Sequence, residues 1–326
     1  MSTPERRINL VNVAQAAGVS VSTASAALSG TGRVSPATAD RVRVVAVELG
    51  YRVDPSARQL RSDRAHVVGV VIDTDAVNLD SNQSPAMWWP RAVFALVDAL
   101  ASHNIVVQLI SAKTETNWPA LAVDAVITVE RPGGHSVLPQ GVPYGTPIFF
   151  GGDLDSSDDT VTQIAPDFDS VCDLALSHLS TRGAQRIGLL TLAARISFAT
   201  HLESSYERWC LQHDQQPIVV GRNGGAPALL VDELLTQGCD SIFSISNASA
   251  ETLKALMARR RVPDQCKLLV LSEGLVEEHL RPRITVVSLD GARAGRMVAE
   301  QIVKAINADR PSSVRIEPLL ILGEST

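Results

Sequence analysis

Short hydroxyl side chains crowd one stretch near the amino terminus of this 326-residue chain. Serine and threonine hydroxyls beside helix N-termini can donate hydrogen bonds to phosphate oxygens, so the chemistry they could perform together is phosphate binding. A single residue of this kind is more often a helix cap or a surface group, and only the clustering favours a function. The residues are Ser20, Thr23, Ser25, Ser29, Ser35 and Thr38.

Three short helices must position these hydroxyls. Apolar residues spaced i, i+3, i+4 and i+7 predict a first helix over residues 10–17. Ser20 is a typical N-cap for a second helix that runs to about residue 28. Ser35 followed by Pro36 opens a third helix, because proline fits the first helical position, and Gly50 closes it.

Small residues lie where a helix-turn-helix needs them. Gly18 can adopt the positive φ of a tight turn between the first two helices. Ala14 lets the second helix approach the first, and Ala24 packs beneath the crossing. Three helices joined in this way can also be purely structural.

Charge is divided unevenly along the chain. Residues 1–64 contain nine Arg, no Lys and five Asp or Glu, a net charge of +4, whereas the remainder carries −10. The overall charge of −6 therefore conceals a basic head on an acidic body. This asymmetry is expected when only one end of a protein meets phosphates, so it favours a DNA-binding head over a purely structural one.

Four motifs give the head a family resemblance. They read V-A-x-x-A-G-V-S-x-S-T-x-S, V-S-P-x-T-x-x-R-V, L-G-Y and P-S-A-R-x-L-R, in chain order between residues 13 and 61. With them the chain resembles the lactose-repressor and galactose-repressor family of bacterial transcription regulators. The resemblance continues more loosely through the body. It implies a sequence-specific DNA-binding regulator, most often a repressor.

The resemblance implies roles in DNA binding. The second helix should lie in the major groove, with Val21 and Ser22 at base-contacting positions and Ala26 one turn further. Many family members carry Arg where this chain has Ala26. A bidentate Arg–guanine pair supplies about 1–3 kcal/mol of discrimination, so direct base recognition should be sparse and rely on DNA shape. Residues expected to contact or frame phosphates are Ser20, Thr23, Ser25, Ser29, Arg33, Ser35, Thr38 and Tyr51.

Residues 54–64 resemble the hinge of this family, which folds as a short helix on operator DNA. Ala57 and Leu60 are then expected at the DNA, with Leu60 as an apolar wedge that bends the duplex from the minor groove. The alternative is an ordinary linker whose Leu60 packs on the body. Because one hinge helix of this length is marginal alone, the resemblance requires a homodimer.

Beyond residue 65, apolar runs alternate with helical segments, which predicts two α/β lobes with doubly wound parallel sheets and a cleft between them. The resemblance adds that this body is periplasmic-binding-protein-like. The predicted domains are a helix-turn-helix head (1–53), a hinge (54–64) and an effector-binding body (65–326). Within the body, the N-lobe takes about 65–165 and 290–317, and the C-lobe takes about 166–289 and 318–326.

Ligands of such folds bind at the carboxyl ends of the strands, facing the cleft. Aromatic side chains there could stack on a sugar or a base, and carboxylates could bind hydroxyl groups. Trp88 and Trp89 could equally pack in a loop or at a dimer contact, and Asp290 could simply cap a helix. The residues predicted to bind a small-molecule effector are Asp73, Trp88, Trp89, Phe198, Asn247, Glu273 and Asp290.

The predicted cleft departs from the family pattern. Leu202 stands at the position of the family's effector-clamping Arg, Asn247 replaces a usual Asp, and Glu273 stands in for the Asp of a G-x-D motif. The effector therefore stays open. A sugar or polyol follows from family habit alone, and an effector-independent regulator is an alternative.

Other classes of protein are disfavoured. No apolar run suits a signal peptide or a membrane span, so we expect a cytoplasmic protein rather than a solute-binding protein with the same body. No G-x-G-x-x-G, Walker or G-x-S-x-G motif occurs and the histidines lack metal spacing, so we expect no enzyme activity, cofactor or metal. The four cysteines lack C-x-x-C spacing and should be buried free thiols.

Overall fold

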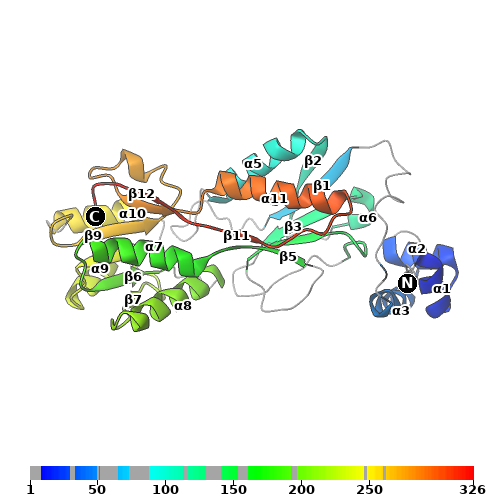
Figure 1. Ribbon diagram of the computed structural model, residues 1–326, viewed down its shortest axis with the longest axis horizontal. Helices are drawn as coiled ribbons and strands as arrows, with labels where there is room; N and C mark the ends of the chain where they lie inside the picture. The colour runs from blue at the N-terminus through cyan, green and yellow to red at the C-terminus, as the bar shows by residue number, and fades with distance from the viewer. Residues whose placement is uncertain are drawn as a thin grey trace, which may run out of the picture.

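The computed structural model describes residues 9–29, 34–49, 51, 65–72, 88–112, 116–129, 141–152, 161–191, 197–245, 248–259 and 262–326. Figure 1 shows an amino-terminal group of helices, a central α/β lobe and a second α/β lobe that carries the C-terminus. The predicted fold class, an all-α head with two α/β lobes, is confirmed. The predictions for the hinge at 54–64 and for Arg33, Ala57, Leu60, Asp73 and Asn247 lie outside the described residues.

The head follows its predicted helices closely. They are α1 (Leu10–Ala16), α2 (Val21–Ser29) and α3 (Pro36–Glu48). Gly18 has a φ of +65°, and a Cβ there would meet no other atom, so backbone conformation rather than space selects glycine at the turn. Ala14 and Ala24 are buried in the small apolar core between the helices, as predicted.

The N-lobe is built on a sheet with strand order β11-β5-β4-β3-β1-β2, whose paired strands run parallel. Its strands are β1 (His66–Ile72), β2 (Ile105–Ser111), β3 (Ala125–Val129), β4 (Ile148–Gly151), β5 (Val161–Pro166) and β11 (Val314–Ile316). Its helices are α5 (Trp88–Ala101), α6 (Trp118–Leu121) and α11 (Gly291–Ile306).

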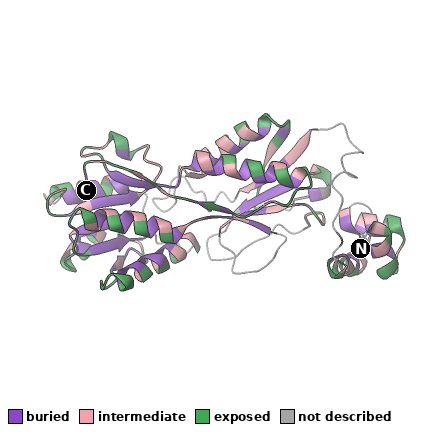
Figure 2. Cartoon of the chain, viewed as in Figure 1, coloured by how far each residue is buried: buried purple, intermediate pink, exposed green. Residues whose placement is uncertain are grey.

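The C-lobe sheet has the order β12-β10-β9-β8-β6-β7, parallel except for β12, which runs antiparallel to β10. Its strands are β6 (Ile187–Leu190), β7 (Val219–Val220), β8 (Ser241–Ser244), β9 (Lys267–Leu271), β10 (Thr285–Ser288) and β12 (Leu319–Ile321). Its helices are α7 (Phe168–Thr181), α8 (Ser197–Gln212), α9 (Pro227–Thr236), α10 (Ser249–Ala258) and η1 (Glu277–His279). Figure 2 shows buried strands between helices that are exposed on their outer faces, which is why these strands read as continuous apolar runs.

The chain passes between the lobes where β5 leads to α7, where β10 leads to α11 and where β11 leads to β12. These strands therefore end at the crossings, and the strands parallel to them end on the same side of each sheet. The carboxyl ends of both sheets consequently point toward the crossings, where a ligand of such a fold is expected. The domain boundaries themselves stay predictions.

Helices α5 and α11 pack side by side on one face of the N-lobe sheet (Figure 1). Two glycines on α11 make the close approach possible. A Cβ on Gly291 would overlap the backbone oxygen of Trp88, and a Cβ on Gly295 would overlap that of Ala92. The two helices thus meet backbone to backbone, with no side chain between them at these points.

The four cysteines are buried free thiols, as predicted. Burial raises the pKa of Cys239 to about 11, so its thiol stays protonated and unreactive at neutral pH. Within the described ranges, no helix combines the length and the apolar character that a bilayer crossing requires.

Candidate functional site

The N-terminus of α2 gathers three hydroxyl groups. Ser20 Oγ accepts a hydrogen bond from the backbone N–H of Thr23 at 3.1 Å, which confirms Ser20 as the predicted cap. The same oxygen lies 2.7 Å from Thr23 Oγ1 and 2.9 Å from Ser22 Oγ. The first turn of α2 contains no acidic residue, so no carboxylate of that turn neutralises the positive end of the helix dipole. An anion is the natural ligand of this helix end.

The N-terminus of α3 repeats the arrangement. Ser35 Oγ accepts from the backbone N–H of Thr38 at 3.3 Å and lies 2.8 Å from Thr38 Oγ1. Again the first turn contains no acidic residue. The predicted cap at Ser35 and the proline at the first helical position are both confirmed.

The residues of α2 that were predicted to contact DNA differ in their exposure to solvent. Ser20, Val21 and Ser22 are exposed, and 43% of Val21 is accessible although it is apolar. Thr23, Ser25 and Ala26 are half-buried. Ser29 Oγ donates to the carbonyl oxygen of Ser25 at 2.7 Å, so this hydroxyl is engaged within the helix.

Trp88 and Trp89 begin α5, close to a crossing between the lobes. Their rings meet edge to face with centroids 4.9 Å apart. Trp88 Nε1 is buried and has no hydrogen-bond partner among the described residues. A buried indole N–H usually finds an acceptor, and the described residues supply none to this donor.

Glu273 follows β9 and joins the two lobes. Its carboxylate accepts from the backbone N–H of Gly291 at 3.0 Å and from Ser288 Oγ at 3.2 Å. Across the crossing, Arg91 Nε on α5 lies 3.2 Å from Glu273 Oε2. Only 4% of the Glu273 side chain is exposed, and this burial raises its pKa. Its visible role is therefore to hold the lobes together.

Asp290 and Phe198 also have defined local partners. Asp290, with a φ of +45°, caps α11 by accepting from the backbone N–H of Arg293 at 3.1 Å. This is the alternative that the sequence left open for it. The rings of Phe198 and Phe168 meet edge to face with their centroids 5.3 Å apart. Phe168 begins α7, which follows the crossing after β5, and Phe198 lies in the first turn of α8, which follows β6. Direct contact with an effector stays a prediction for both residues.

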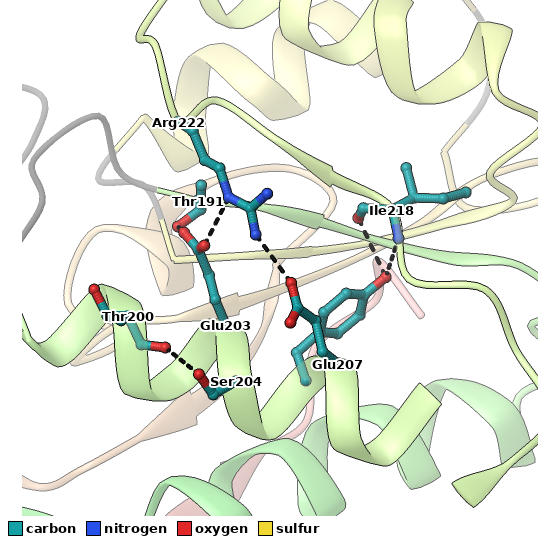
Figure 3. Close-up of polar contacts among 8 residues, drawn as sticks. Thr191, Thr200, Glu203, Ser204, Glu207, Ile218 and Arg222 are labelled. Carbon is teal, nitrogen blue, oxygen red and sulfur yellow. Dashed lines mark hydrogen bonds and ion pairs between the residues drawn. The ribbon is translucent and has the colours of Figure 1, made fainter. Parts of the chain in front are cut away.

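Figure 3 shows a polar cluster at the carboxyl ends of β6 and β7 that the sequence did not predict. Thr191 Oγ1 donates to Glu203 Oε1 at 2.6 Å. Arg222 donates from Nε to Glu203 Oε2 at 2.8 Å and from its terminal nitrogen to Glu207 at 3.0 Å. The Arg222 side chain is half exposed, so the cluster presents a guanidinium beside α8. Leu202, which stands at the family's Arg position, is fully buried.

Glu273 should leave a pH signature on stability. Because burial raises its pKa, the folded chain holds the Glu273 proton more tightly than the unfolded chain does. The free energy of unfolding contributed by this group therefore falls as pH rises from 4.5, its ordinary value, through its raised value. Glutamine does not ionise, so Glu273→Gln does not lose this stability as pH rises. The melting temperature of the variant relative to wild type should therefore rise as pH increases from 4.5 through the raised pKa of Glu273.

Thermal unfolding of both proteins over a pH series checks this expectation. Glu300→Gln is the matched control, because Glu300 is an exposed carboxylate on α11. A melting-temperature difference for Glu273→Gln that stays constant over the pH series would contradict the assignment.

The head and the lobes together define a class: a helix-turn-helix DNA-binding protein with a body like those of periplasmic binding proteins. The profile of the bacterial regulatory proteins of the lacI family matches residues 9–54, and that of the periplasmic binding protein-like domain matches residues 176–326. The chain belongs to the lacI family and is a DNA-binding transcriptional regulator.

Curated relatives agree with this assignment. The HTH-type transcriptional regulator CelR of Thermobifida fusca is 26% identical over 345 residues, covering 98% of each chain. The maltose regulon regulatory protein MalI of Escherichia coli K12 is 29% identical over 194 residues, covering 57% of this chain and 54% of MalI. The relatives are transcriptional regulators by name, and none of these names describes an enzyme.

Solved structures share the fold of the whole chain. A CelR–cellobiose complex superposes with a TM-score of 0.65 at 23% identity, covering 98% of this chain and all of that one. The lac repressor dimer bound to operator and the anti-inducer ONPF gives a TM-score of 0.64 at 16% identity, covering 98% and 99%. At these identities the likeness concerns the fold alone.

Proposed function

We propose that this protein is a homodimeric repressor whose head binds an operator and whose body binds a small polyhydroxy compound that changes operator affinity. The observation that carries the DNA-binding part is the exposed N-terminal turn of α2, with Ser20, Val21 and Ser22 at an unneutralised helix end. The hydroxyls suit phosphate oxygens, and the Val21 methyls suit a thymine methyl in the major groove. The net charge of +4 in residues 1–64 supports the same surface.

The effector is proposed to bind at the crossings, where the strand ends of both lobes meet. Trp88 offers a buried indole donor there, and the Thr191–Glu203–Arg222 cluster lies at the strand ends of the C-lobe. Aromatic rings together with carboxylate and guanidinium groups suit a ligand rich in hydroxyls. The relative CelR has been crystallised with cellobiose, which makes a carbohydrate the first compound class to test.

The dimer is proposed to form through α5 and the edge strand β2. Phe94 and Val97 on α5 are exposed, and so are Val106 and Leu109 on β2. The neighbouring α5 residues Leu96 and Leu100 are buried in the core, so the helix has two apolar faces, and the described residues cover only one of them. A second copy of the chain would cover the other face.

Effector binding is coupled to operator binding if the ligand prefers one arrangement of the lobes. Such a ligand shifts the population toward that arrangement and changes the spacing of the two heads in the dimer. The Arg91–Glu273 ion pair spans the crossing, so any lobe movement must keep or break it.

A binding-site selection with the full chain tests the proposal. Selected DNA should bind specifically in a mobility-shift titration, and Ser22→Asp, which places a carboxylate at the phosphate-facing helix end, should weaken binding by about a hundredfold. Ser102→Asp makes the same change on an exposed N-lobe residue and should have no effect. Carbohydrates are then screened for those that raise the melting temperature and alter the shift. Equal binding by wild type and Ser22→Asp would overturn the assignment of α2.

A further inference from the structure

A turn of the N-lobe reaches the head. Thr146 N–H donates to the carbonyl oxygen of Pro143 at 3.1 Å, and Gly145 within this turn has a φ of +78°. These features define a type II turn, in which the third residue needs positive φ and is usually glycine. The second residue, Tyr144, is therefore at the tip of the turn, just before β4.

Tyr144 makes two hydrogen bonds to the head. Its backbone N–H donates to the carbonyl oxygen of Leu28, near the end of α2, at 2.8 Å. Its phenolic hydroxyl donates to the carbonyl oxygen of Tyr51, beyond α3, at 3.0 Å. The last carbonyl oxygens of a helix find no N–H donor within their own helix. The backbone N–H of Tyr144 therefore supplies the Leu28 carbonyl with a donor that α2 lacks.

Apolar packing adds a third contact. The Tyr144 ring packs against the apolar core of the head, in which Ala24, Ala27 and Leu28 of α2 are buried. One residue of the body thus caps the recognition helix, bonds the chain after α3 and covers part of the core between them.

The contact leaves the DNA-facing end of α2 free. Tyr144 bonds near the C-terminus of the helix, whereas Ser20, Val21 and Ser22 at its N-terminus stay exposed. A contact that blocked DNA binding would cover these residues. The arrangement instead fixes the orientation of α2 relative to the N-lobe while keeping its N-terminal turn accessible.

We propose that Tyr144 is a positioning residue that docks the head on the N-lobe and orients α2 for the operator. This inference rests on the proposed DNA-binding function of the head. Docking supplies a connection between body and head in addition to the covalent one through residues 52–64. A pre-oriented head loses less rotational freedom when it binds, so operator affinity rises without any contact between Tyr144 and DNA.

Fluorescence anisotropy decay tests docking directly, without DNA. The native cysteines are buried, so a Gln15→Cys substitution on the exposed side of α1 gives a selective labelling site. In the full chain the labelled head should rotate with the body, at a single slow correlation time. Tyr144→Ala should add a fast component, whereas Tyr144→Phe, which keeps the ring and the backbone N–H, should add little. Fast rotation of the head in the labelled Gln15→Cys chain that retains Tyr144 would overturn the docking.

Operator titration tests the consequence. Tyr144→Ala should weaken binding about tenfold, and Tyr144→Phe about two- to threefold, because it loses one hydrogen bond only. The dependence of affinity on salt should keep its slope in both variants, because no phosphate contact is removed. Unchanged or tighter binding by Tyr144→Ala would overturn the positioning role. If the unsubstituted chain selects no DNA, the proposed function fails, while the anisotropy result still decides the docking.

Discussion

Gly295→Ala is expected to destabilise the N-lobe by about 3 kcal/mol, although alanine is the better helix former. In an exposed helix the substitution would stabilise by about 1 kcal/mol. Here the added methyl group would overlap the carbonyl oxygen of Ala92 on α5, and the backbone nitrogen of Leu96 is close to it as well. Both neighbours are backbone atoms and cannot rotate away, so the two helices must separate and the steric cost outweighs the helix preference.

Chemical unfolding followed by tryptophan fluorescence measures this effect. Trp88, Trp89 and Trp118 all lie in the N-lobe, whereas Trp209 lies in the C-lobe, so the signal reports mainly on the N-lobe. Arg296→Ala is the matched control, because Arg296 is the next residue of α11 and is exposed. Equal unfolding midpoints for Gly295→Ala and Arg296→Ala would show that the helices have room for a methyl group.

Phe94→Glu is expected to convert the protein to a monomer and to reduce operator affinity by on the order of a hundredfold or more. Phe94 is 74% exposed on α5, so the substitution removes little packing within the chain. In the proposed dimer, however, it would bury a carboxylate in an apolar interface, which is costly without a partner charge. Loss of the dimer uncouples the two heads, so binding of the second half-site is no longer assisted by the first.

Sedimentation velocity and mobility-shift titration check the two parts of this result. Leu211→Glu is the control, because Leu211 is 71% exposed on α8 in the other lobe. It should leave the oligomeric state and DNA binding unchanged. A dimeric Phe94→Glu protein with unchanged affinity would place the interface elsewhere.

Local features were predictable from the sequence. The caps at Ser20 and Ser35 and the turn at Gly18 depend on a few adjacent residues, and the structure confirms them. Strands buried on both faces, such as β1 and β9, were recognisable because long apolar runs mark them. The short strands β5 and β11 were not predicted as strands, since β5 contains Thr162 and Gln163 and β11 has only three residues.

The tertiary contacts of the candidate sites were not predictable. Arg91 pairs with Glu273, Arg222 pairs with Glu203, and Tyr144 bonds to Leu28 and Tyr51. Each pair joins elements separated in the sequence, so no periodicity or local motif indicates it. Glu273 shows the difference most clearly. The sequence indicated a carboxylate at a strand end, which is where it lies, but it did not indicate that this carboxylate accepts hydrogen bonds from Gly291 and Ser288 and forms an ion pair with Arg91.

Because the ribosome synthesises the chain from its N-terminus, folding of the N-lobe is delayed until α11 has been made. Strand β5 ends at Pro166, but α11, which packs on α5, begins only at Gly291, after most of the C-lobe has been made. At about 5–20 residues per second, this interval lasts on the order of ten seconds. The head can fold during that time, because all its helices come from the first part of the chain. A nascent protein therefore has a complete DNA-binding head before either lobe can close its core, and the face of α5 that packs on α11 must avoid other partners until α11 has been made.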